Sequence, residues 1–250
     1  MDQLVRELPR GRLRHVLGVA GTAAELAERF GADPQKARTA GLLHDIVRLW
    51  PPERLLAACQ ERGLSLSDFD LEHPVVRLHG LLASHLAEEW FGIEDADIKA
   101  AIASHTVGRP QMSRLERILY VADYCEPSRG PQAEDVRVAA RNDLDAAVRL
   151  AMDRTIAYLL ERGRAIHPEA VAARNAFLGD SMRAGPTPRS GRQRPWPLLQ
   201  DGRWQTRYKW GAQGATRIPS DPGSSRCPRR ADELGGQPAG VPFQGRKIPA

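Results

Sequence analysis

The chain has 250 residues, of which 27% are charged and 6% aromatic, and its formal net charge is +5. This charge is unevenly placed, because residues 181–250 carry 13 basic and 4 acidic residues whereas residues 1–180 carry 23 basic and 27 acidic residues. The basic character therefore belongs to the C-terminal segment, and the mildly acidic first 180 residues do not have the composition of a nucleic-acid-binding domain.

Cysteine usage and hydropathy exclude several further classes. The three cysteines, Cys59, Cys125 and Cys227, are widely separated, so neither a disulfide framework nor a paired zinc site is indicated. Residues 1–7 lack the apolar core of a signal peptide. No apolar stretch approaches the ~18 residues that a transmembrane helix needs. We therefore expect a cytoplasmic location and no membrane partner.

Helical patterns extend over residues 10 to 178. Asp33-Pro34 is typical of an N-cap followed by proline in the first turn. The helix that begins there is expected to continue to about Trp50, where Pro51-Pro52 ends it and opens the next, which ends near Gly63. Further helices are expected at about 77–91, 95–105, 112–125, 133–141, 143–162 and 168–178. Without any alternating strand pattern, hairpin signal or internal repeat, the predicted fold class is an all-α helical bundle.

Composition divides the chain at about residue 180. Residues 181–250 hold 10 glycines, 10 prolines and 11 arginines without helical or strand periodicity. Such a segment cannot bury enough apolar surface to offset its chain entropy. We therefore expect a helical domain over 1–180 and a disordered basic tail over 181–250. Two alternatives stay open for this tail: a reading-frame artefact, or binding of single-stranded nucleic acid through arginines interleaved with Trp196, Trp204, Tyr208 and Trp210.

Six of the seven histidines fall within the first 105 residues, and four of them form an ordered series with two aspartates. The series is His15, His44-Asp45, His79, His105 and Asp123. Imidazole and carboxylate are ligands that transition metals prefer. Each member is expected on an apolar helix, where a charged group is costly unless something pairs it. A metal is one such partner, and isolated hydrogen-bonded core groups are the alternative.

The adjacent pair His44-Asp45 bears on where such an ion would lie. On one helix these side chains would diverge by about 100°, so a shared ion is expected at a helix crossing. His15 and Asp123 come from helices that are distant in the sequence, and they can close the coordination from the other side.

Several local strings resemble one known family, the YqeK-type HD-domain phosphohydrolases, which are similar to symmetrical diadenosine tetraphosphatases. The resemblance covers about residues 10–178, departs at Arg48, where lysine is more usual, and ends before the tail. The strings that carry it are Arg14-His15-Val16, residues 40–46, Leu78-His79-Gly80, residues 101–108, Met112-Ser113, residues 120–124, residues 126–129 and residues 166–171.

The resemblance implies a metal-dependent hydrolase that cleaves diadenosine tetraphosphate symmetrically to two ADP. With iron as the expected metal, the ligands implied for the principal ion are His15, His44, Asp45 and Asp123. His79 and His105 are implied either to hold a second ion or to face the phosphates, and with Asp45 they are the expected catalytic residues. Ligand type alone leaves manganese, cobalt, nickel and zinc open. A bound ion would lower the pKa of a water molecule and polarise a phosphoryl oxygen.

The expected nucleotide contacts surround the same series. Guanidinium groups suit bidentate contacts to phosphate, and Thr106 can donate its hydroxyl at a helix end. His73 and His85 are expected to lie outside the site. The full expected set is Arg48, His79, His105, Thr106, Asp123, Arg129 and, carried over from the family, Ile166, His167, Pro168 and Val171.

Two other functions stay open, because a metal site does not choose its substrate. The nearer is another HD-type nucleotide phosphatase or phosphodiesterase. The other is a non-catalytic nucleotide-sensing or RNA-associated binding module. The expected partner is a small dinucleoside polyphosphate, with nucleic acid bound only through the tail, and the oligomeric state is open, a homodimer included.

Overall fold

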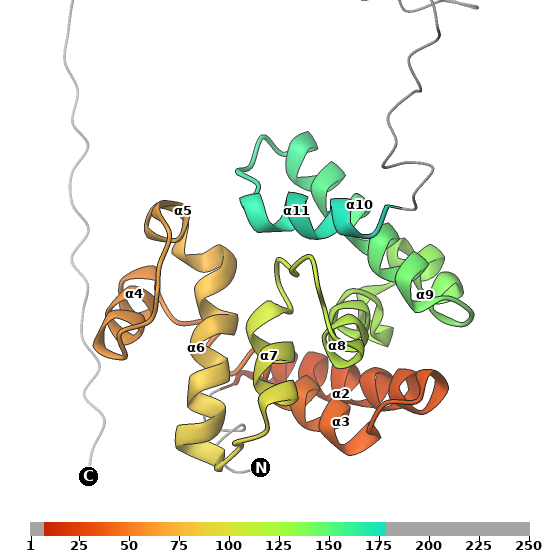
Figure 1. Cartoon of the computed structure of the whole chain (residues 1–250), viewed down its shortest axis with the longest axis horizontal. Helices are drawn as coiled ribbons and strands as arrows, with labels where there is room; N and C mark the ends of the chain where they lie inside the picture. The colour runs from red at the N-terminus through yellow and green to blue at the C-terminus, as the bar shows by residue number, and fades with distance from the viewer. Residues whose placement is uncertain (1–7, 179–250) are drawn as a thin grey trace, which may run out of the picture. The chain divides into compact units, whose positions relative to one another are not determined.

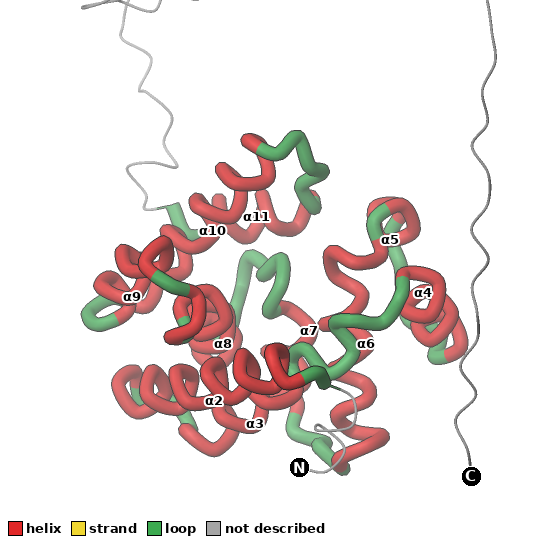
Figure 2. Tube along the Cα trace, turned by 180° about the vertical axis from the view of Figure 1, so that it is seen from behind, coloured by secondary structure: helices red, strands yellow, loops and turns green. Residues whose placement is uncertain are grey.

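Helices are the only regular secondary structure in residues 8–178, the part of the chain that the computed structural model describes. This part contains ten α-helices, two short 3₁₀ helices and no strand (Figures 1 and 2). The predicted all-α fold class is confirmed, whereas the predicted tail over 181–250 lies outside the described residues. No helix between residues 8 and 178 has the length and hydropathy that would let it cross a membrane. The elements are α2 (Arg10–Phe30), α3 (Pro34–Leu43), α4 (Pro52–Glu61), α5 (Asp68–Glu72), α6 (Pro74–Phe91), α7 (Ala96–Ser104), α8 (Arg114–Cys125), η1 (Pro127–Arg129), η2 (Pro131–Ala133), α9 (Glu134–Ala140), α10 (Leu144–Glu161) and α11 (Pro168–Ala176).

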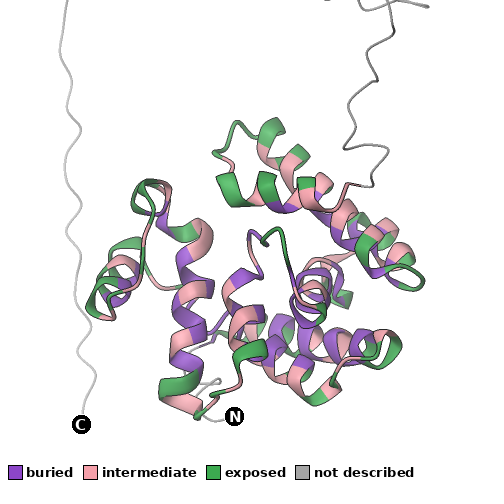
Figure 3. Ribbon diagram, in the orientation of Figure 1, coloured by how far each residue is buried: buried purple, intermediate pink, exposed green. Residues whose placement is uncertain are grey.

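The buried core lies largely where α2, α3, α6, α7 and α8 face one another (Figure 3). Gly31 ends α2 in a left-handed conformation with φ of 66°, and a short connection leads back into α3. The two helices approach closely because small residues meet between them. A Cβ atom at Gly41 would lie only 2.7 Å from the Cα and 2.8 Å from the nitrogen of Ala20. Glycine is therefore required at this crossing, next to the pair His44-Asp45.

The end of α3 differs from the prediction. Asp33 caps the helix as expected, accepting hydrogen bonds from two backbone N–H groups of the first turn. However, α3 ends at Leu43 and does not reach Trp50. Beyond it, Ile46, Arg48 and Trp50 donate to carbonyls only three residues earlier, at 3.3, 3.0 and 3.0 Å. His44 and Asp45 therefore lie in a tightened chain of turns.

Other helix ends also depart from the sequence patterns. The helix α5 was not predicted; it is closed by a reciprocal capping box between Ser67 and Asp70. His105 lies one residue beyond the end of α7. The prediction that all six members of the series are carried on helices is therefore correct only for His15, His79 and Asp123.

One buried ion pair ties α5 to α6. Asp70 is fully buried and accepts hydrogen bonds from Ser67 and from Arg77, whose Nε lies 2.9 Å from Oδ1. Burial alone would raise the pKa of Asp70, but Arg77 and Ser67 hold it well below the usual value of a carboxyl group. The carboxylate therefore stays ionised while Arg77 faces it.

We expect Gly41→Ala to destabilise the fold by about 1–3 kcal/mol, because the added methyl group must push two backbones apart. The matched control is Gly21→Ala in α2, where a Cβ atom meets nothing within 4 Å. That change should stabilise the helix by about 0.5–1 kcal/mol. Urea unfolding measures both, and equal midpoints for Gly41→Ala and the wild type would contradict the close crossing.

We expect Asp70→Asn to lower the free energy of unfolding at pH 7 by about 3 kcal/mol or more, because Arg77 is left without its counter-ion. A depressed carboxyl pKa contributes stability above the unfolded value of about 3.9, and this stability is lost as the pH falls below it. The difference between variant and wild type should therefore shrink below about pH 4. Urea unfolding at several pH values tests this, with the exposed Asp68→Asn as the control, and a difference independent of pH would refute it.

Candidate metal centre

The six side chains of the histidine and aspartate series converge on one cluster. They come from five segments far apart in the sequence: α2, the turns after α3, α6, the end of α7, and α8. The histidines and Asp45 are buried, and the Asp123 side chain is 23% exposed. The cluster consists of His15, His44, Asp45, His79, His105 and Asp123.

Asp45 lies at the centre of this cluster. Its Oδ2 is 3.5 Å from Nε2 of His44 and 3.8 Å from Nε2 of His15. Its Oδ1 is 3.5 Å from Nε2 of His79 and 3.7 Å from Nε2 of His105. Each carboxylate oxygen therefore faces its own pair of imidazoles. The polar atoms of His44 and Asp45 reach this point together, although the two residues are adjacent in the chain.

Asp123 closes the cluster on one side. Its Oδ1 lies 3.1 Å from Nε2 of His15 and 3.9 Å from Nε2 of His44. Two groups of three have ligand atoms within 4.8 Å of one another: His15, His44 and Asp123 form one, and His44, Asp45 and His105 form the other. Because His44 belongs to both, the two groups adjoin.

Hydrogen bonds at Nδ1 orient three of the imidazoles. His44 and His105 each bond a backbone carbonyl three residues earlier at 2.7 Å, and His15 bonds Glu126 Oε1 at 3.0 Å. With Nδ1 occupied in this way, Nε2 points into the cluster. The Nε2 atoms of His15 and His44 are buried and have no hydrogen-bond partner. Metal-ligating histidines show this pattern, so the cluster fits a divalent transition metal.

The charges of the cluster shift the pKa values of its members in different directions. Burial would lower the pKa of His15 and His44, but Asp123 and Asp45 outweigh it and raise both. Burial would raise the pKa of Asp45, but the rings of His44 and His105 hold it well below the usual carboxyl value. Asp123 behaves likewise, because the neighbouring His15, together with the charges of His44 and Arg129, outweighs its burial. Burial and the neighbouring His105 lower the pKa of His79. Both carboxylates are therefore ionised and His79 is neutral near pH 7, as metal coordination requires.

Two glycines make room for this geometry. A Cβ atom at Gly80 would lie 3.0 Å from the ring of His105, so α6 can carry His79 and still admit that ring. A Cβ atom at Gly18 would lie 2.5 Å from Oε2 of Glu126, so this glycine leaves space for the carboxylate that orients His15.

Two contributors were not predicted from the sequence. Arg12 lies one helical turn before His15 and donates from Nη1 to Oδ2 of Asp45 at 2.8 Å. Glu126 is buried, accepts from His15 and also accepts from both the N–H and the hydroxyl of Ser128. For Arg12 the available signal was its i, i+3 spacing from His15.

The expected phosphate contacts lie around the cluster. Thr106 Oγ1 is 3.2 Å from Nε2 of His79 and 3.3 Å from Nε2 of His105. Arg129 donates from Nη2 to Asp123 Oδ1 at 2.6 Å. Arg48 is half-buried and close enough for its charge to lower the pKa of His79.

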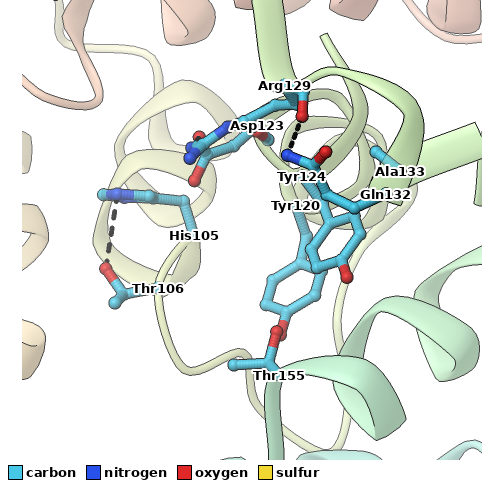
Figure 4. Close-up of a pocket in the computed structure, with 9 residues that line it drawn as sticks. All are labelled: His105, Thr106, Tyr120, Asp123, Tyr124, Arg129, Gln132, Ala133 and Thr155. Carbon is cyan, nitrogen blue, oxygen red and sulfur yellow. Dashed lines mark hydrogen bonds and ion pairs between the residues drawn. The ribbon is translucent and has the colours of Figure 1, made fainter. Parts of the chain in front are cut away.

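A pocket of about 320 Å³ opens beside this cluster (Figure 4). His105, Thr106, Asp123 and Arg129 line the end of the pocket at the cluster, and Thr155 of α10 lies across from them. A small-molecule phosphate therefore has a route to the cluster from this side.

The segment 166–171 lies elsewhere. His167 caps α11 by accepting from the N–H of Glu169 at 3.1 Å, and its ring packs edge-on against Phe69 with centroids 4.8 Å apart. Its Nε2 lies 3.6 Å from Oδ1 of Asp70. Neither His167 nor its predicted companions Ile166, Pro168 and Val171 line the pocket. Their nucleotide contacts therefore stay a prediction from the resemblance.

Comparisons with known proteins agree with this arrangement. The chain matches the HD domain family over residues 12–128. It is 39% identical to the "Bis(5'-nucleosyl)-tetraphosphatase, symmetrical" of Halalkalibacterium halodurans and 35% identical to that of Bacillus subtilis, covering in each case 70% of this chain and 94% of the relative. A crystal structure of a predicted HD superfamily hydrolase involved in NAD metabolism, from Clostridium acetobutylicum, is similar with a TM-score of 0.68 and 40% identity. It covers 70% of this chain and 93% of that one.

The helical fold and the His/Asp cluster, with these similarities, define an HD-domain phosphohydrolase that requires a divalent metal. More narrowly, the chain belongs to the YqeK-type family within that class.

We expect Glu126→Ala to weaken the affinity for a divalent metal by about 10–100-fold, because His15 loses the partner that orients its ring. Glu126→Gln retains an acceptor and should lose less. Calorimetric titration of the metal-stripped protein with Mn²⁺ measures both changes, and Glu28→Ala, at an exposed position in α2, is the control. An unchanged affinity in Glu126→Ala would show that the hydrogen bond from His15 to Glu126 does not contribute to metal binding.

Proposed function

We propose that this chain cleaves dinucleoside tetraphosphates symmetrically, converting diadenosine tetraphosphate and water to two ADP. The observation that carries the proposal is the cluster itself, where buried imidazole nitrogens without protein partners surround two ionised aspartates. The names of the Halalkalibacterium and Bacillus relatives support the substrate. A phosphoanhydride is a suitable target, because a metal can stabilise the charge that develops on it.

The proposed ligands of the principal ion are His15, His44, Asp45 and Asp123. Iron is the expected metal on the grounds of family resemblance. When bound, the ion would lower the pKa of a coordinated water and polarise a phosphoryl oxygen. His79 and His105 face the other oxygen of Asp45. These two histidines can therefore bind a second metal ion or contact the phosphates.

The reaction consumes one water molecule. Its oxygen bonds to one of the two central phosphorus atoms. The bond from that atom to the oxygen that bridges the two central phosphorus atoms breaks, so two ADP molecules result. His79 can accept the water proton at Nε2, since its burial and the ring of His105 keep the imidazole neutral. Arg48, Arg129 and Thr106 then stabilise the charge on the departing phosphate.

We expect Fe²⁺-loaded protein to hydrolyse diadenosine tetraphosphate under anaerobic conditions and to release ADP alone. Metal-stripped protein should be inactive, because no side chain in the cluster replaces the ion as a Lewis acid. Chromatographic separation of the products measures the outcome. AMP together with ATP as products, or no turnover by metal-loaded protein, would overturn the proposal, and a panel of other nucleotides and phosphodiesters would then identify the substrate.

We expect His44→Ala and Asp45→Ala to abolish this turnover while the helical circular dichroism is largely retained. The matched control is His85→Ala, which removes another histidine of α6 that lies outside the cluster. Retained activity in His44→Ala, with the metal content unchanged, would exclude the proposed ligand set.

A further inference from the structure

We propose that a groove between α8 and α10, entered from Asp123 and Arg129, holds the nucleoside on one side of the cleaved bond. This inference rests on the proposed function. Symmetric cleavage leaves one ADP on either side of the broken bond, so the chain needs two places for a nucleoside. The segment 166–171 is the expected binding place of one nucleoside. The sequence patterns did not identify a binding place for the second nucleoside.

The groove consists of two adjoining pockets. The inner pocket, of about 320 Å³, begins at the cluster with His105 and Asp123. The outer pocket, of about 610 Å³, continues along α10 to Tyr158. The two pockets adjoin, because Tyr124, Gln132 and Thr155 line both of them. Both volumes lie in the range of small-molecule sites, roughly 300–1,000 Å³.

The side chains along the path suit a nucleobase. The side chain of Tyr124 lines both pockets. Aromatic side chains bind bases by stacking, whichever base is presented. Gln132 also lines both pockets, and a carboxamide can pair with the ring nitrogen and exocyclic amine of adenine. A base can therefore be held both by its face and by its edge.

The charges along the path suit phosphates at one end and a polar nucleoside at the other. Arg129 lines the inner pocket and donates a hydrogen bond to Asp123 of the cluster. Arg154 lies at the outer pocket, where it donates to Asp135 Oδ2 at 2.6 and 3.0 Å. Each end of the path thus carries an arginine that is paired with an aspartate, and the arginine next to the cluster is the one that phosphates would reach.

This groove is separate from the segment 166–171. His167 faces Phe69 and Asp70 of α5, whereas the groove is lined by α8, η2 and α10. None of residues 166–171 lines either pocket. The groove therefore leaves that segment to the nucleoside on the other side of the cleaved bond.

The test uses exposed positions on α10 so that the fold is preserved. Ala157 lines the outer pocket, and Ala157→Trp would fill it. Leu160→Trp places the same ring on the same helix at a residue that is 65% exposed and lines neither pocket. Tyr124→Ala removes the stacking ring, and Tyr124→Phe retains it. Metal content is measured for each variant, because Tyr124 follows Asp123.

Calorimetric titration of the metal-loaded protein with ADP should give two sites per chain in the wild type, Leu160→Trp and Tyr124→Phe. It should give one site in Ala157→Trp and Tyr124→Ala. In hydrolysis assays, the latter two variants should raise the KM for diadenosine tetraphosphate by about 10-fold or more, because the second base no longer stacks. The KM for adenosine 5′-tetraphosphate, which has one nucleoside, should change by less than about twofold.

One ADP per wild-type chain, or an unchanged KM for diadenosine tetraphosphate in Ala157→Trp, would overturn the groove and leave the proposed function standing. A parallel rise in KM for both substrates would also overturn it. Two ADP per chain without hydrolysis of diadenosine tetraphosphate would instead overturn the proposed function alone.

Discussion

A carboxylate buried among imidazoles is the constraint on which the rest of this structure depends. Asp45 has almost no contact with water, and an ionised group in such a place is costly unless other charges and hydrogen bonds compensate it. The histidines that surround it come from four different segments. The segments that carry them must therefore approach one another within a few ångströms of one point. Much of the packing of the domain serves that convergence.

The small residues near the cluster follow from the same constraint. Gly41 lets α3 approach α2, Gly80 lets α6 approach His105, and Gly18 admits Glu126 beside α2. At each of these positions a larger residue would place a Cβ atom against a neighbouring backbone, against the ring of His105 or against the carboxylate of Glu126. The short turns after Leu43 act similarly, since they bring His44 and Asp45 round to the same point. Fold and chemistry are thus determined by the same few close contacts.

The sequence predicted those features that local signals encode. Apolar periodicity and the Asp33-Pro34 cap identified the helices, and the residue types of the histidine and aspartate series identified the cluster, whose members the structure does bring together. The end of α3 was not predicted, because no glycine or proline follows Leu43 until Pro51, so the sequence carries no local stop signal there. The hydrogen bond from Arg12 to Asp45 spans 33 positions, and that from His15 to Glu126 spans 111. Such pairings depend on how helices are placed in space, which a single sequence does not encode locally.

The arginines of the cluster have a consequence for how the protein matures. Arg12 pairs with Asp45 at 2.8 Å and Arg129 pairs with Asp123 at 2.6 Å, so each aspartate already has a fixed positive neighbour. The chain can therefore fold before it meets an ion, without leaving bare negative charge inside. A divalent metal held by His15, His44, Asp45 and Asp123 would share the two carboxylates with these guanidinium groups. Each arginine would then lie beside both the ion and an incoming phosphate, so the groups that keep the aspartates ionised before the metal binds would also recognise the substrate.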